Sequence, residues 1–146
     1  KMDYINLGFS GSAKGEDIMV DYLASIDCSL FVCDYDHNAP TPEHLEATHE
    51  AFFKLIRKKN PNLPVVMMTR PAITYDDDCK LRREIVKRTY HNALARGDKN
   101  VYFIDGESFF GGDDREICTV DRIHPNDLGF YRFYKALLPV FETALN

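Results

Sequence analysis

The sequence has no long apolar run and no dense cluster of Lys and Arg. A helix that crosses a membrane needs about 20 consecutive apolar residues, and the N-terminus lacks the charged and apolar layout of a signal peptide. We therefore expect a soluble chain without a membrane span. Nucleic-acid binding draws on clustered cations, whereas the net charge here is -5, so we expect no nucleic-acid partner.

Closely spaced cysteines are also missing. The four cysteines are Cys28, Cys33, Cys79 and Cys118. None of them forms the C-x-x-C pair that is typical of zinc and redox sites, and this favours a reduced, cytoplasmic protein. Internal repeats and linkers are absent as well, and 146 residues is an ordinary size for one domain. We expect a single domain over residues 1–146.

Short apolar runs alternate with amphipathic segments along the chain. The apolar runs predict strands at 4–8, 29–33, 64–69 and 101–105. Apolar residues at helical spacing predict helices over about 15–26, 42–60, 76–97 and 130–141. Strands that alternate with helices are typical of a mostly parallel sheet with helices on both faces. The sequence therefore predicts an α/β fold.

Glycines and polar residues follow the predicted strands. In a parallel sheet, the loops at the carboxyl ends of the strands collect reactive groups. A Gly backbone N–H and an Asn amide can donate to an oxyanion, and an Asp can orient a His so that it accepts a proton from a nucleophile. The residues of interest are Ser10, Gly11, Asn38, Arg70 and, before the last helix, Asp121 and His124.

Three segments resemble sequence blocks of the SGNH, or GDSL-type, esterase and lipase family. Residues 6–11 (NLGFSG) are similar to the second block of the family, residues 31–38 (FVCDYDHN) to the third and residues 121–129 (DRIHPNDLG) to the final one. The blocks occur in the family's order and extend over nearly the whole chain. The resemblance implies a flavodoxin-like three-layer sandwich with a mostly parallel sheet.

The resemblance also implies roles for individual residues. Asp121 and His124 would be the Asp and His of a catalytic triad, and Gly11 and Asn38 would form the oxyanion hole. The implied reaction is the hydrolysis of esters of small acids, acylated sugars among them, through an acyl-enzyme and without a cofactor.

The family's first block, which supplies the nucleophilic Ser, has no counterpart in the sequence. That block is a strand ending in a Gly-x-Ser turn, and only residues 1–7 precede the second block here. In a flavodoxin-like sheet this strand lies between the second and the third, which would otherwise carry unpaired backbone groups. We therefore expect an N-terminally incomplete domain, completed by a preceding segment or by a strand from a partner. The first residue, Lys1 rather than Met, agrees with this expectation.

Ser10 is a fallback candidate for the nucleophile. It follows Gly8 in a Gly-x-Ser context, and a predicted helix comes after it. However, the family has a further strand and helix between the nucleophile and the oxyanion Asn, and between Ser10 and Asn38 there is room for only one of each. The alternative is that Ser10 lines the oxyanion turn or caps the following helix.

Other interpretations of these residues remain open. His124 precedes Pro125 and could cap the last helix, with Asp121 accepting hydrogen bonds from loop amides. Asn38 could be an ordinary turn residue, and Gly11 could be needed only for a positive φ. The rival function is a non-catalytic α/β module that serves in binding or assembly.

Further charged residues lie in the same loops. Arg70 could steer an anionic group of a substrate, cap a helix or pair with Asp76. Asp34, Asp36 and His37 have metal-ligand chemistry, but the family resemblance implies no metal.

Two groups of side chains are expected to be structural. His44, His49 and His91 lie in predicted helices, where we expect them at the surface. The Phe and Tyr residues of the last predicted helix are expected in the core, because they form its wide apolar face.

Overall fold

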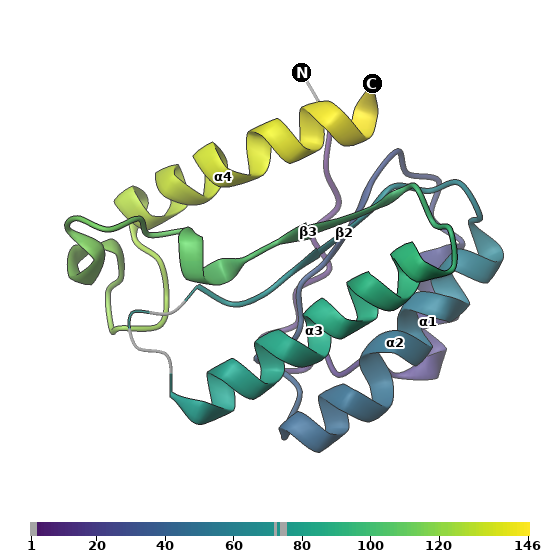
Figure 1. Cartoon of the computed structure of the whole chain (residues 1–146), viewed down its shortest axis with the longest axis horizontal. Coiled ribbons are helices and arrows are strands. Elements are labelled where there is room, and N and C mark those ends of the chain that lie inside the picture. Colours follow the sequence, from purple (N-terminus) through teal and green to yellow (C-terminus); the bar gives the residue numbers. More distant parts are fainter. Residues whose placement is uncertain (1–2, 72, 74–75) are drawn as a thin grey trace.

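The computed structural model describes residues 3–71, 73 and 76–146. Its helices are α1 (Asp17–Ala24), α2 (Pro42–Lys59), α3 (Asp77–Ala95) and α4 (Asp127–Leu145). Its strands are β1 (Phe31–Cys33), β2 (Val65–Met68) and β3 (Val101–Ile104). Two short 3-10 helices, η1 (Gly106–Ser108) and η2 (Arg115–Cys118), lie between β3 and α4 (Figure 1).

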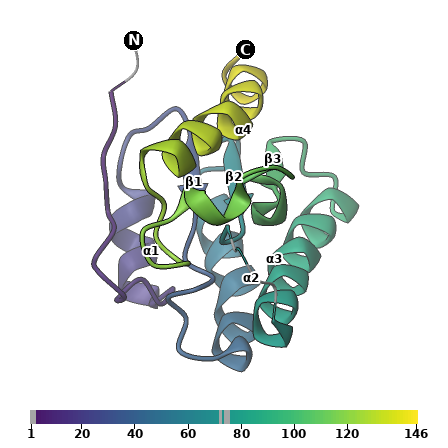
Figure 2. The same ribbon diagram turned by 90° about the vertical axis from the view of Figure 1, so that its left-hand side faces the viewer.

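The three strands form one parallel sheet in the order β1-β2-β3. Helices α1, α2 and α3 cover one face of this sheet and α4 covers the other, as the two views show (Figures 1 and 2). All of β2 is buried, and its side chains alternate between the two faces: Val65 and Met67 pack in the core cluster on one face, Val66 and Met68 in that on the other. The predicted three-layer α/β fold is confirmed.

Helix starts follow local sequence signals. The hydroxyl oxygen of Thr41 accepts a hydrogen bond from the backbone N–H of His44, and Pro42 is the first residue of α2. The carboxylate of Asp76 accepts one from the backbone N–H of Cys79 at the start of α3. Each cap satisfies an N–H that has no partner inside the helix, which explains why these boundaries were predictable from the sequence.

The strand predicted at residues 4–8 is wrong for this structure. Residues 3–9 form no strand, and Tyr4 is 85% exposed. This segment runs along the outside of the molecule, on the side nearer β1 than β3 (purple in Figure 2). Within the described residues β1 pairs only with β2. A strand forms when a neighbour takes up its backbone hydrogen bonds, and no strand in the described part of the chain pairs with residues 4–8.

His49 is buried, contrary to the expectation of a surface position. It shares a face of α2 with Leu45, Phe52 and Phe53, and this spacing of about one helical turn was a usable signal. Its Nδ1 lies 2.9 Å from the hydroxyl of Thr89, and its ring stacks on that of Tyr35. Burial lowers the pKa of His49 to about 4. The imidazole is therefore neutral at neutral pH.

The aromatic residues of α4 divide between core and surface. Phe133 and Phe141 pack against the core on the α4 side of the sheet, as predicted. Phe130, Tyr131 and Tyr134 are more than half exposed, so the prediction that all of these rings are buried is wrong. The apolar face of α4 is wider than the part that packs against this core, so the outer rings lie in solvent. No helix in the described ranges is both long and apolar enough to cross a membrane.

Glu50 links α2 to α3 through three partners. Its carboxylate lies 2.9 Å from the Lys54 ammonium, 2.8 Å from the Asn92 amide and 2.7 Å from the Arg96 guanidinium. Partial burial opposes ionisation, but the hydrogen bonds from these three side chains prevail and lower the pKa of Glu50 from 4.5 to about 2. The charged form is therefore the one that the fold stabilises.

We expect Glu50→Gln to reduce the free energy of unfolding at pH 7 by roughly 1–2 kcal/mol, because it weakens charge-assisted hydrogen bonds. The stabilisation by Glu50 is complete above pH 4.5 and is lost as the pH falls from there towards 2. Urea unfolding at pH 7 and pH 3 should therefore give a smaller difference between variant and parent at pH 3. Glu46→Gln is the matched control, since the Glu46–Arg88 pair is exposed. An equal loss in both variants would contradict the prediction.

Candidate active site

Asp121 and His124 lie in direct contact. The Oδ2 of Asp121 is 2.6 Å from the Nδ1 of His124, and its Oδ1 accepts hydrogen bonds from the backbone N–H groups of Ile123 and His124, at 2.9 and 2.7 Å. The hydrogen bonds from the backbone and side chain of His124 lower the pKa of Asp121 to about 2. A carboxylate at Nδ1 favours the tautomer with a proton on that nitrogen, which leaves Nε2 as a proton acceptor.

The start of α4 holds this loop in place. The backbone N–H of Asn126 donates to the carbonyl of Cys118 at 3.0 Å, its side-chain amide donates to that of Ile117 at 2.7 Å, and its Oδ1 accepts from the backbone N–H of Gly129 at 3.1 Å. A Cβ at Gly129 would lie 2.2 Å from the carbonyl oxygen of Cys118. Asn126, rather than His124, therefore caps the last helix.

The His124 imidazole is open to solvent. The side chain of His124 is 73% exposed and that of Asp121 is 48% exposed. Among the described residues, no hydrogen bond involves His124 Nε2. The loop lies at the end of the molecule towards which β2 and β3 point with their carboxyl ends (Figure 1). This is where a parallel α/β sheet places its reactive groups.

Ser10 and Gly11 form the corners of a tight turn. Their φ angles are 36° and 74°, and the backbone N–H of Ser12 donates to the carbonyl of Phe9 at 3.0 Å. Gly11 thus has a positive φ, which is the alternative, structural reason for a glycine at this position. Both residues are exposed. In the part of the chain that the structure describes, neither forms a hydrogen bond with Asp121 or His124.

Asn38 lies in a turn directly after β1. Its backbone N–H donates to the carbonyl of Tyr35 at 3.0 Å, and its side chain is half-buried. No hydrogen bond to the side-chain amide is present among the described residues, nor one that joins Asn38 to Asp121 or His124. The amide is therefore available to a ligand. The backbone of Asn38 also acts as an ordinary turn residue, which was the other interpretation of the sequence.

Arg70 follows β2 and lies beside the Asn38 turn. Its backbone N–H donates to the Oδ2 of the buried Asp36 at 3.1 Å, and its Nη1 is 2.6 Å from the imidazole of His37. Burial and the positive charge of Arg70 lower the pKa of His37. The loops after β1 and β2 are therefore joined at the carboxyl end of the sheet, and the Arg70 guanidinium lies at their junction.

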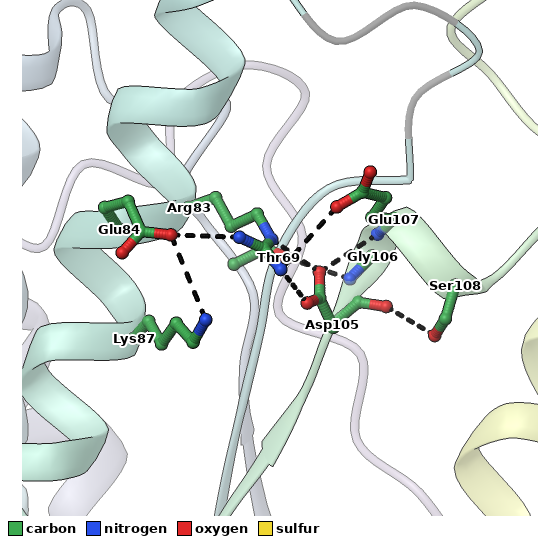
Figure 3. Close-up of polar contacts among 8 residues, drawn as sticks. All are labelled: Thr69, Arg83, Glu84, Lys87, Asp105, Gly106, Glu107 and Ser108. Atoms are coloured by element: carbon green, nitrogen blue, oxygen red, sulfur yellow. Dashed lines mark hydrogen bonds and ion pairs between the residues drawn. The ribbon is translucent and has the colours of Figure 1, made fainter.

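The loop after β3 is packed onto the loop after β2 (Figure 3). The backbone N–H of Gly106 donates to the hydroxyl of Thr69 at 2.9 Å, and a Cβ at Gly106 would lie 2.2 Å from the carbonyl oxygens of Thr69 and Arg70. Arg83 binds the carboxylate of Asp105 with two hydrogen bonds, one of them 2.8 Å long. Partial burial opposes the ionisation of Asp105, but the hydrogen bonds from Arg83 prevail and lower the pKa of Asp105. Arg83 and Asp105 thus support the backbone that carries Arg70.

Sequence reasoning missed the charged residues of α3 that hold these loops, Arg82 and Arg83. Arg82 lies on the face of the helix that also carries Cys79, Ile85 and Val86. A charged residue three positions from apolar neighbours on both sides predicts a buried cation with partners.

Asp34, Asp36 and His37 do not come together as ligands: no cluster of three or more His, Cys, Asp or Glu in the described residues could hold a metal ion.

A family model for the GDSL-like lipase/acylhydrolase family matches residues 1–142. The chain belongs to this family. The GDSL-like family assignment agrees with the three segments that resemble its sequence blocks. No curated protein matches the sequence.

Solved structures of similar fold include a protein from Bacteroides ovatus assigned to the GDSL-like lipases, with a TM-score of 0.85 and 32% identity over 97% of this chain and 43% of that one. A salicylyl-acyltransferase from a tetracycline biosynthetic pathway has a TM-score of 0.72 and 15% identity over 92% of this chain and 44% of that one. A family two carbohydrate esterase from Clostridium thermocellum, in complex with cellohexaose, has a TM-score of 0.65 and 16% identity over 80% and 36% of the two chains. The chain thus spans less than half the length of each of these three structures.

Proposed function

We propose that the protein is a serine ester hydrolase in which His124 is the general base and Asp121 orients it. The observation that carries this proposal is the 2.6 Å contact between Asp121 and the Nδ1 of His124, which leaves an exposed Nε2 in a chain of the GDSL-like family. An ionised Asp beside Nδ1 stabilises the imidazolium that forms when Nε2 takes a proton.

The proposed reaction has two steps. His124 Nε2 removes the proton of a serine hydroxyl as the serine oxygen attacks the acyl carbon, and it then donates that proton to the departing alcohol. Asn38, through its side-chain amide, and Gly11, through its backbone N–H, stabilise the tetrahedral oxyanion. In the second step His124 deprotonates a water that attacks the acyl-enzyme, and the serine leaves with the proton. The chemistry requires no cofactor.

We propose that the nucleophilic Ser belongs to a segment that pairs with the free edge of β1, either from the same gene product or from a partner. Two observations support this origin. The edge of β1 opposite β2 carries no strand in the described residues, and the segment of residues 3–9, which runs on that side of the molecule (Figure 2), has exposed apolar side chains at Tyr4 and Ile5. Ser10 remains the fallback nucleophile, although the described residues show no hydrogen bond between it and His124.

The proposed substrates are esters of small acids, with acylated sugars as one class. The carbohydrate esterase of similar fold was solved with cellohexaose, which supports testing acylated sugars first. Arg70 is the proposed contact for a polar or anionic group of the substrate, because its guanidinium lies beside the Asn38 turn. A cation there would draw negative charge towards the oxyanion donors.

A non-catalytic binding or assembly module is the second candidate. It is favoured by one observation: no serine in the described part of the chain forms a hydrogen bond to His124. Such a module would keep the scaffold and the Asp121–His124 contact, but its surface rather than its chemistry would carry the function.

Hydrolysis of p-nitrophenyl acetate separates the two candidates. We expect the full-length gene product to be active and the 146-residue chain to be inactive, with Ser10→Ala leaving the full-length activity unchanged. Activity in the 146-residue chain that disappears with Ser10→Ala would move the nucleophile to Ser10. No activity in either form, for acetylated sugars as well, would support the non-catalytic module.

A further inference from the structure

A buried arginine holds the turn that carries Asn38. Arg82 lies in the first half of α3 and is only 6% exposed. Its Nη1 donates to the backbone carbonyls of Asp36 and Ala39, at 2.6 and 2.7 Å. Its Nε donates to the carboxylate of Asp78 at 2.6 Å. A buried guanidinium needs such partners, because an unpaired charge in the interior is costly.

The two carbonyls that Arg82 binds lie on either side of His37 and Asn38. Between them, the backbone N–H groups of Asn38 and Ala39 both donate to the carbonyl of Tyr35, at 3.0 and 3.2 Å. The turn is therefore closed on one side by its own backbone and on the other by α3. The contacts of Arg82 thus hold the backbone from which the Asn38 side chain extends, and the backbone conformation limits which rotamers that side chain can adopt.

Arg82 is poorly placed to touch a substrate itself. The cavity that it lines with Asp36, Thr69 and Arg70 has a volume of about 10 Å³. That is room for about one water molecule and not for an ester. Any effect of Arg82 on the reaction must therefore pass through the residues that it holds.

We propose that Arg82 is a positioning residue that acts through Asn38, by fixing the backbone turn from which the Asn38 amide reaches the oxyanion. This inference rests on the proposed ester hydrolysis. A donor that is displaced loses strength in the transition state, where the oxyanion forms, more than in the bound ester. Removal of Arg82 therefore lowers kcat and has little effect on KM.

The test is a double-mutant cycle in the full-length gene product. Arg82→Met is expected to lower kcat for p-nitrophenyl acetate by about tenfold or more, with KM changed less than about threefold. In an Asn38→Ala background the same substitution is expected to change kcat by less than about twofold, because the donor that it displaces is already gone. Arg88→Met is the matched control on α3, since Arg88 is exposed and pairs only with Glu46 among the described residues; it should leave kcat unchanged.

A second variant distinguishes the loss of positioning from a loss of folding. Arg82→Lys keeps the charge but cannot match the planar fork that spans two carbonyls and a carboxylate, so we expect a folded protein with an intermediate kcat and the same dependence on Asn38. Additive effects of Arg82 and Asn38 substitutions would overturn the positioning role while leaving the proposed hydrolysis intact. An Asn38→Ala variant with unchanged kcat would instead overturn the oxyanion assignment, and the positioning role with it.

Discussion

Replacing His124 by alanine is expected to lower kcat of the full-length gene product for p-nitrophenyl acetate by about four to six orders of magnitude. Loss of the base leaves the serine hydroxyl protonated and the leaving alcohol without an acid, and residues of a triad act as a unit. The measurement is steady-state hydrolysis, with urea unfolding to verify that the variant is folded. Because His124 is exposed, the free energy of unfolding should change little.

His91→Ala is the control for this experiment. His91 is an exposed histidine of α3, so its replacement removes an imidazole without touching the proposed site. An Asp121→Asn variant should fall by about four orders of magnitude, since an amide favours the wrong tautomer of the imidazole. Full activity in His124→Ala would rule out this residue as the base.

Asn38→Ala is expected to lower kcat by about two to three orders of magnitude, which is the usual cost of losing one oxyanion donor. KM should change little, because the amide acts on charge that develops only in the transition state. The backbone hydrogen bond from Asn38 to Tyr35 does not depend on the side chain, so the turn should persist in the variant.

Asn62→Ala is the matched control for the Asn38 experiment. Asn62 is exposed in the turn before β2, at the opposite end of the sheet from the Asn38 turn. Its side chain should have no effect on kcat. If Asn38→Ala raised KM and left kcat unchanged, Asn38 would be a contact for the ground state of the substrate and not an oxyanion donor.

Much of the fold follows from local patterns. The continuous apolar run of β2 predicts a strand that is buried on both faces, and the caps at Thr41 and Asp76 mark helix starts because each satisfies a nearby N–H. The strand predicted at residues 4–8 does not form in the structure. Its apolar character is genuine, but strand formation depends on a neighbour that no local pattern supplies.

The candidate site likewise has a part that local sequence predicts and a part that it does not. Asp121 and His124 are three positions apart, so their contact is a local property of one loop. The support of Asn38 by Arg82 joins residues that lie 44 positions apart in the sequence. Such a contact depends on how α3 packs on the sheet. A sequence alone therefore indicates which side chains can react more readily than it indicates which side chains hold them in place.

The burial of His49 makes the fold sensitive to acid. The unfolded chain binds a proton at this imidazole near pH 6.5, whereas the folded chain binds it only near pH 4. As the pH falls from 6.5 to 4, the free energy of unfolding therefore decreases by about 1.4 kcal/mol for each pH unit. Above pH 6.5 this loss is absent. His49 stacks on Tyr35, whose carbonyl closes the Asn38 turn. Mildly acidic conditions would thus lower the free energy of unfolding through a residue that packs against the turn of the proposed oxyanion donor.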